Sequence, residues 1–161
     1  MIDILVPVLG RPQNAQPLAD SIATHTTMPY TLLFLTSPGD QAEFDACVLT
    51  GANVLEVVTN RSGDYAKKIN RGYLETISPF LLLAADDVEF TYGWDTTVLD
   101  LAIRTGKGVV GTNDLANRSV MAGVFSTHPL VRRDYIEYRG GSLDGPRIVY
   151  HEGYDHNYPD R

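Results

Sequence analysis

Two adjacent carboxylates hold the most informative position in this 161-residue sequence. Asp86 and Asp87 directly follow an apolar run, Phe80 to Ala85. Such a run is typical of a buried central strand, and open α/β sheets bind ligands at the carboxyl ends of their strands. Two neighbouring acids there repel each other, and a bound Mn²⁺ or Mg²⁺ relieves the repulsion. Because phosphate oxygens usually complete the shell of these ions, the pair predicts a metal site facing a diphosphate. A merely solvated strand end is the alternative.

A phosphorylated ligand also requires local positive charge, which this acidic chain must supply from a few residues. The formal net charge is -7, so nonspecific nucleic-acid binding is not expected. The candidate cations are Arg11, Arg61, Lys67 and Lys68. The two lysines fit equally well on the solvent-exposed face of a helix.

A histidine- and acid-rich segment near the end of the sequence is a second candidate. His151 and His156 flank Glu152 and Asp155, and His151 is a possible further metal ligand. An exposed loop is the alternative interpretation. A structural zinc site is not expected, because the spacing fits none and Cys47 is the only cysteine.

The elements that position these residues alternate between strands and helices. Apolar runs predict strands over residues 2–8, 30–35, 54–58, 80–85, 108–112 and 120–126. Apolar periodicity predicts helices near residues 17–22, 44–48, 64–77, 94–102 and 129–138. This alternation implies βαβ units and an α/β fold with a mostly parallel, doubly wound sheet covered by helices on both faces.

Length and composition predict one domain over residues 1–161. Hydrophobic residues make up 43% and charged residues 20%, which is a globular composition. The single cysteine fits a reducing compartment. The first residues lack the features of a signal peptide, and no apolar run is long enough to span a membrane. We therefore expect a cytoplasmic protein, with an oligomeric state that the sequence does not indicate.

Five segments, taken in order, are similar to segments of the family 2 glycosyltransferases, which have the GT-A fold. They are residues 4–8 with Arg11 and Pro12, then 68–72, 82–89, 130–135 and 154–160. The first resembles the family's opening strand and nucleotide-contacting loop, and the second a helix with a recurrent Asn-x-Gly. The third resembles the Asp-x-Asp strand end. The fourth resembles the entry of an acceptor-side helix, and the fifth the acidic motif that supplies the catalytic base.

The resemblance implies roles for particular residues. Asp160 corresponds to the base, and Asp87 to the second, metal-binding acid of Asp-x-Asp, with Asp86 beside it. The implied donor-binding residues are Pro7, Val8, Arg11, Ser37, Arg61, Lys68, Asn70 and Asp86. The sequence departs from the family pattern at two places. Ala85 replaces the first acid, and residues 36–39 end the second strand without the acids that usually recognise base and ribose.

The function implied is metal-dependent transfer of a sugar from a nucleoside-diphosphate-sugar, with a UDP-sugar favoured, to an unknown acceptor hydroxyl, with inversion. A non-catalytic nucleotide-sugar or carbohydrate-binding domain is one alternative, favoured by Ala85 and the altered second strand. A nucleotidyltransferase is another, although such enzymes normally carry a glycine-rich loop where Val8 to Pro12 has one glycine.

Overall fold

The computed structural model describes residues 1–59, 65–115, 117–139 and 145–152. Arg61 and Asp160, two of the predicted site residues, lie outside them, as does His156.

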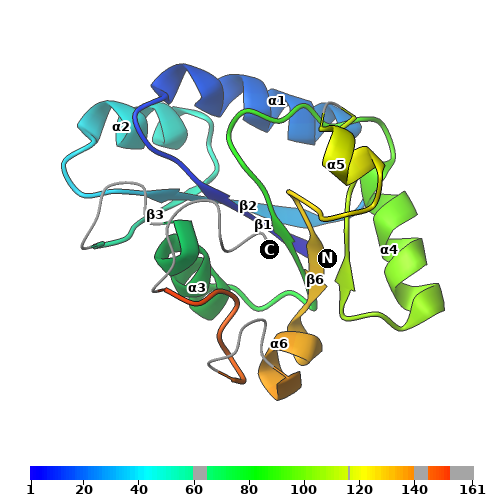
Figure 1. The fold of residues 1–161 in the computed structure, drawn as a ribbon. Helices are drawn as coiled ribbons and strands as arrows, with labels where there is room; N and C mark the ends of the chain where they lie inside the picture. Colours follow the sequence, from blue (N-terminus) through cyan, green and yellow to red (C-terminus); the bar gives the residue numbers. More distant parts are fainter. Residues whose placement is uncertain (60–64, 116, 140–144, 153–161) are drawn as a thin grey trace.

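A six-stranded sheet with the order β3-β2-β1-β4-β6-β5 forms the centre of the described structure (Figure 1). Its strands are β1 (Ile2–Pro7), β2 (Tyr30–Thr36), β3 (Asn53–Glu56), β4 (Phe80–Leu83), β5 (Val109–Val110) and β6 (Leu130–Arg132). The first four are parallel, and β6 is antiparallel to both of its neighbours. We call the end of the sheet where β1, β2 and β4 finish its carboxyl end, and the opposite end its amino end.

Helices cover both faces of the sheet, as predicted (Figure 1). On one face lie α1 (Ala15–His25), α2 (Gln41–Leu49) and α4 (Trp94–Thr105). On the other lie α3 (Tyr65–Glu75) and α6 (Arg133–Arg139). The short elements η1 (Pro12–Asn14) and α5 (Arg118–Met121) complete the set. Alternating residues of the strands divide between the two cores: Ile4 faces the first and Leu5 the second.

The central strand β4 explains why Asp86 and Asp87 stand where they do. Leu81, Leu82 and Leu83 are almost completely buried because helices cover the strand on both sides. The N–H of Ala84 still donates to the carbonyl of Leu5 at 3.0 Å, so pairing with β1 continues beyond the strand. The acid pair therefore begins where sheet pairing stops, at the carboxyl end.

Two of the predicted elements are wrong. Residues 120–126 do not form a strand: α5 occupies residues 118–121, and Gly123 turns the chain with a φ of 72°. Residues 129–138 are not one helix, since β6 precedes α6. Burial explains the second difference, because Leu130 and Val131 pair with Leu82 and Leu81 of β4 and are covered there.

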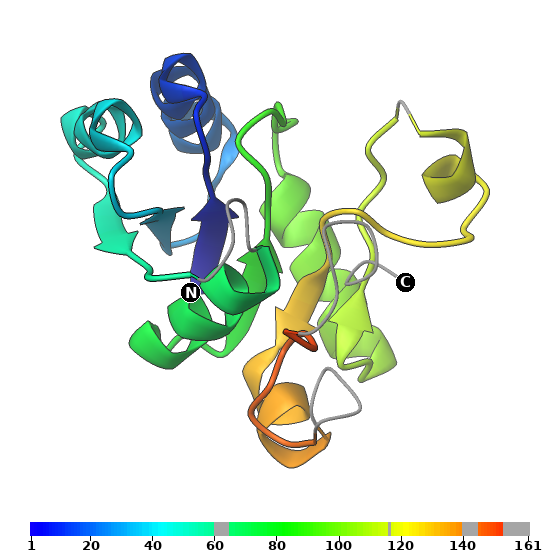
Figure 2. The ribbon, with the colours of Figure 1, turned by 60° about the vertical axis from the view of Figure 1, so that its left-hand side comes forward.

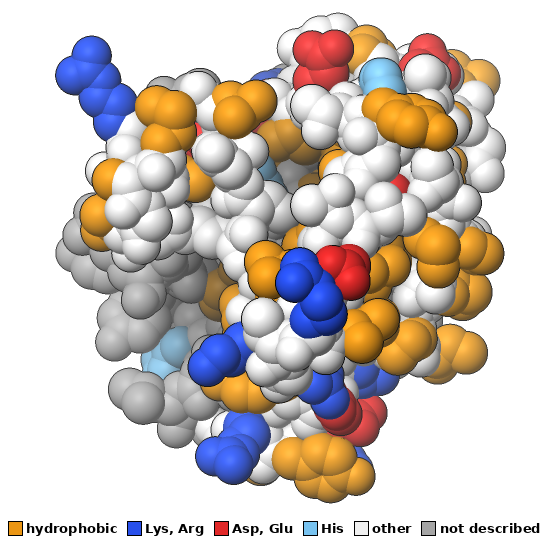
Figure 3. All heavy atoms as spheres, turned by 90° about the vertical axis from the view of Figure 1, so that its right-hand side faces the viewer, with side chains coloured by type: hydrophobic (Ala, Val, Ile, Leu, Met, Phe, Trp, Pro, Cys, Tyr) orange, Lys and Arg blue, Asp and Glu red, His pale blue; other side chains and the backbone are white. Residues whose placement is uncertain are grey.

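The β5 side of the molecule exposes several hydrophobic side chains, with Lys and Arg among them (Figure 3). Leu101 and Ile103 of α4 are 40% and 70% exposed, whereas Leu99 faces the core. Within the described ranges, no helix has the length and apolar character needed to cross a membrane.

Candidate functional site

Arg11 joins the two acids at the carboxyl end of the sheet. It comes from the loop after β1, and Asp86 and Asp87 come from the loop after the adjacent strand β4. Arg11 Nη1 lies 2.9 Å from Asp87 Oδ2, and Nη2 pairs with Asp86 Oδ1. The Asp87 side chain is 56% exposed and that of Asp86 only 1%. The guanidinium thus serves as the counter-ion of one buried and one accessible carboxylate.

Asp86 is incompletely satisfied. Its buried Oδ2 has no hydrogen-bond partner of ordinary geometry among the described residues. Burial raises the pKa of Asp86 above its usual range and Asp87 adds to the rise, whereas Arg11, the N–H of Asp86 itself and the side chain of Asn14 oppose it. A buried carboxylate oxygen without a partner is costly, so a cation or a donor bound here gains more than it would at a solvated acid.

The backbone of the β1 loop is held by three side chains. Gly10 N donates to Asp40 Oδ2 at 2.9 Å, and Arg11 N donates to Glu43 Oε2 at 2.6 Å. Lys68 Nζ donates to the carbonyl of Val8 at 2.6 Å. Lys68 is 1% exposed, so it is not on the wet face of its helix. These bonds fix the loop that the resemblance assigns to the nucleotide.

Glu43 belongs to the site although apolar periodicity does not point to it. Of the α2 residues, Glu43 and Cys47 are buried, and the apolar Val48 is 49% exposed. Burial raises the pKa of Glu43, and the hydrogen bond from Arg11 N opposes the rise. The available signal was the spacing from Asp40, the N-cap of α2, to Glu43, which is that of a capping box.

Asn70 organises the segment that carries His151. Its Nδ2 donates to Tyr150 O at 2.8 Å and to Glu152 Oε1 at 3.0 Å, and its Oδ1 accepts from the N–H groups of Val149 and Tyr150. Every hydrogen-bonding position of the amide is thereby used or shared. Asn70 positions this segment, and its contact with a nucleotide stays a prediction.

The other predicted site residues that the structure describes do not form a closed metal site. Pro7 ends β1, and the buried Ser37 follows β2 with its Oγ unpartnered among the described residues. No group of three or more His, Cys, Asp or Glu side chains within the described ranges converges in a way that could hold a metal ion. His151 as a ligand therefore stays a prediction.

A cavity of about 660 Å³ adjoins Asp87, and we call it the Asp87 pocket. It lies between the segment after β4, the start of α4 and the loop after β5, and its lining includes Glu89, Phe90, Trp94, Thr112, Asn113, Asp114 and His128. Trp94, at the start of the predicted helix 94–102, is half-buried, with its Nε1 donating to Thr26 Oγ1 at 3.0 Å and its ring 4.9 Å from that of Phe90.

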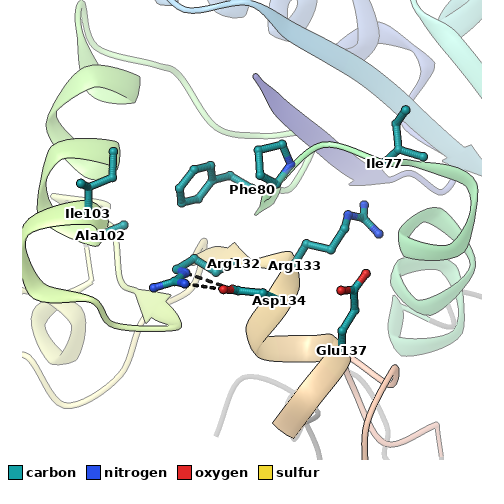
Figure 4. Close-up of a pocket in the computed structure, with 9 residues that line it drawn as sticks. Ile77, Phe80, Ala102, Ile103, Arg132, Arg133, Asp134 and Glu137 are labelled. Atoms are coloured by element: carbon teal, nitrogen blue, oxygen red, sulfur yellow. Dashed lines mark hydrogen bonds and ion pairs between the residues drawn. The ribbon is translucent and has the colours of Figure 1, made fainter.

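A second cavity, of about 570 Å³, lies at the amino end of the sheet (Figure 4). Arg132 pairs with Asp134 there, and Arg133 projects toward α3 (Figure 4). Because β6 is antiparallel, Arg132 stands opposite Phe80, the first residue of β4. These two basic residues therefore lie at the end of the sheet opposite Asp87, and the resemblance of their segment to the entry of an acceptor-side helix stays a prediction.

Comparison with known proteins shows the fold of this chain. No protein-family model and no curated protein matches the sequence. Glucosyl-3-phosphoglycerate synthase from Mycobacterium tuberculosis, in complex with Mn²⁺, UDP and phosphoglyceric acid, matches with a TM-score of 0.62 and 17% identity over 86% of this chain and 58% of the synthase. Its complex with Mn²⁺, UDP-glucose and phosphoglyceric acid matches with the same TM-score and identity, over 86% and 59%.

The same synthase with Mg²⁺ and UDP also has a TM-score of 0.62 and 17% identity, over 86% of this chain and 58% of the synthase. The chain thus spans less than two thirds of the length of the synthase. These matches establish the GT-A fold of the glycosyltransferases for this chain, confirming the predicted fold class.

Proposed function

We propose that this domain binds a nucleoside-diphosphate-sugar, with a UDP-sugar favoured, at the carboxyl end of its sheet and transfers the sugar to an acceptor hydroxyl. One observation carries the proposal. The acid pair that ends β4 includes a buried carboxylate oxygen without a partner among the described residues, and it lies beside Arg11. The fold is that of an enzyme whose complexes contain UDP-glucose and Mn²⁺, which supports the same ligand class here.

The residues present fit a divalent ion of the Mn²⁺ or Mg²⁺ type. Asp86 and Asp87 offer only hard oxygen donors, and the described residues add no third ligand of the usual kinds. Mg²⁺-like ions are commonly held by one or two carboxylates, with phosphate oxygens and water completing the shell. When bound, the ion would neutralise charge on the leaving diphosphate. Arg11 supplies further positive charge at the same place.

The proposed reaction breaks the bond between the anomeric carbon and the diphosphate and forms a bond to the acceptor oxygen. Asp160 is proposed to accept the acceptor's proton as a general base. Displacement in one step inverts the anomeric carbon. The backbone of the β1 loop, fixed by Glu43 and Lys68, is proposed to position the nucleotide, so that reacting groups are oriented before the step begins.

Calorimetric titration of UDP into the protein, with and without Mn²⁺, tests the donor site. We expect Mn²⁺-dependent binding that Asp87→Ala weakens by about 100-fold, because an accessible carboxylate that holds the ion is lost. Asp100→Ala is the matched control, since Asp100 pairs with the exposed Arg104 on α4. Binding that does not depend on Mn²⁺ or on Asp87 would sink the proposal.

The catalytic part of the proposal has its own readout. Incubation with UDP-glucose, Mn²⁺ and a panel of hydroxyl acceptors is expected to release UDP and form a glucosylated product. Metal-dependent binding without release of UDP under any of these conditions would instead assign the domain to the non-catalytic binding class, because the fold does not determine turnover.

A further inference from the structure

We propose that the Asp87 pocket is the acceptor site and that it selects an uncharged, hydroxyl-rich acceptor, such as a sugar unit, over a phosphorylated one. This inference rests on the proposed function. Asp87 pairs with Arg11 on one side and lines the pocket on the other, so a molecule in the pocket lies next to the proposed diphosphate site. In Figure 2 the green segment after β4 and the yellow-green segment after β5 stand apart from each other, and residues of both line the pocket.

The charge of the pocket argues against an anionic acceptor. Its described lining includes the acids Glu89 and Asp114, together with Asp87, which pairs with Arg11; His128 also lines it, and no Lys or Arg does. A phosphate or carboxylate entering there meets like charges in a partly enclosed space, where repulsion is stronger than in bulk water. The hydroxyl groups of a polyol instead donate hydrogen bonds to carboxylate oxygens.

Asp114 is already held in place for such a role. Its Oδ1 accepts from Asn117 N at 2.7 Å, and its Oδ2 accepts from Thr127 Oγ1 at 3.2 Å. These bonds orient the carboxylate at the edge of the pocket. Recognition by a fixed carboxylate loses little side-chain entropy when the ligand binds.

The aromatic wall completes the chemistry that a sugar ring requires. Phe90 N donates to Ser21 Oγ at 2.8 Å, and the indole N–H of Trp94 donates to Thr26, so both residues are anchored. Their rings provide fixed apolar surface against which the C–H groups of a sugar ring can pack. The pocket, at about 660 Å³, lies within the range of about 300–1,000 Å³ that is usual for small-molecule sites.

This acceptor class differs from that of the synthase that shares the fold. The synthase complexes contain phosphoglyceric acid, which carries a phosphate and a carboxylate. A pocket lined by acids, with neither Lys nor Arg in its described lining, favours a different class. Within one fold, the loops around the site set which acceptor enters.

Trp94 is the only tryptophan of the chain and lines the pocket, so its fluorescence reports occupancy directly. The protein, saturated with UDP and Mn²⁺, is titrated with neutral methyl glycosides and with the corresponding sugar 6-phosphates. We expect the neutral sugars to change the Trp94 emission and to bind at least about tenfold more tightly than their phosphates. Phosphates binding as tightly as neutral sugars, or no response to any neutral sugar, would overturn the inference.

Two charge-reversal variants test whether the acids of the pocket cause this preference. Glu89→Lys places a cation in the exposed part of the pocket and is expected to reduce the preference for neutral sugars by about fivefold. Asp100→Lys makes the same charge change on α4, away from the pocket, and is expected to leave the preference unchanged. If UDP binds with Mn²⁺ but the preference is absent, only this inference fails. If UDP does not bind, the proposed function fails first.

Discussion

Each end of β4 has an arginine beside a buried aspartate, and the two arrangements differ in how completely they are satisfied. At the amino end, Asp3 is 2% exposed and accepts from Ser78 N at 2.7 Å and from Ser78 Oγ at 2.8 Å. At the carboxyl end, Asp86 is 3% exposed, pairs with Arg11 and leaves one oxygen without a partner. Residue type and burial are the same, so the difference lies in the neighbours.

The two arginines show the same contrast. Arg133 donates to Ser78 O at 2.7 Å, to Tyr73 O at 3.0 Å and to Thr76 Oγ1 at 2.9 Å, and it lies over the Tyr73 ring at 4.7 Å. It thereby binds groups in and just after the last turn of α3, as a cation at a helix C-terminus does. Arg11, with 45% of its side chain exposed, donates through its guanidinium to the two acids and, among the described residues, to no other group. A charged cluster whose hydrogen-bonding groups have partners indicates a structural role. A cluster that leaves such a group unpartnered indicates a site for a ligand.

Arg133→Met is the largest expected perturbation of this comparison. We expect the free energy of unfolding to fall by about 3 kcal/mol, because the variant leaves Asp3 and the end of α3 without their cation while keeping the apolar stem. Urea denaturation measures the loss. Mn²⁺-dependent UDP binding by the folded protein should be unchanged.

Arg133→Lys keeps the positive charge but loses the planar guanidinium that donates to three acceptors. We expect the free energy of unfolding to fall by less than it does in Arg133→Met. Equal stability of Arg133→Met and the wild type would remove the structural role of Arg133. A selective loss of UDP binding at unchanged stability would instead make the amino end part of the binding site.

Asp95→Asn tests a second saturated carboxylate and has a defined pH dependence. Burial raises the pKa of Asp95, but donors including the N–H groups of Met28 and Thr27 outweigh it and lower the pKa below its usual value. The stabilisation by ionised Asp95 is therefore complete above the unfolded-state pKa and is lost as pH falls through the folded-state pKa. We expect Asp95→Asn to lower the free energy of unfolding by about 2 kcal/mol at pH 7. The difference from the wild type should become smaller below about pH 4. A pH-independent difference in denaturation midpoints would contradict this assignment.

The position of the acid pair was predictable because it depends on local pattern and on a general rule of sheet topology. The apolar run 80–85 marked a central strand, and parallel βαβ connections place the residues that follow at the carboxyl end. The short strand β6 was not predictable in the same way. It has three residues, and only pairing with β4, nearly fifty positions earlier, distinguishes it from a helical turn.

The supporting side chains were less predictable than the acids. Glu43 bonds to the β1 loop across 32 positions, and Asn70 bonds to the 149–152 segment across about 80. Neither partner leaves a periodic signal in the sequence near its own residue. A buried charged residue is also the opposite of what apolar periodicity predicts for the inner face of a helix. Such contacts are set by the tertiary fold and require coordinates.

Asp86→Asn has the smallest expected effect on stability. It distinguishes best between the two ends of β4, because we expect it to stabilise the protein. It removes a buried charge whose second oxygen has no partner among the described residues, while Arg11 keeps its contact with Asp87 at 2.9 Å. The free energy of unfolding at pH 7 should rise by about 1 kcal/mol. Since burial, opposed by Arg11, raises the folded-state pKa of Asp86, acidification through that pKa neutralises the wild-type group and should erase the gain.

Whether Asp86→Asn raises or lowers the free energy of unfolding decides whether the buried aspartates at the two ends of β4 have different roles. A stabilised variant with at least about tenfold weaker Mn²⁺-dependent UDP binding would mean that Asp86 is kept charged for the ligand at a cost in stability, the trade expected of a functional site. A destabilised variant, resembling Asp95→Asn, would place Asp86 with Asp3 among the structural carboxylates. Asp87 alone would then remain as the group at this end of the sheet that faces a ligand.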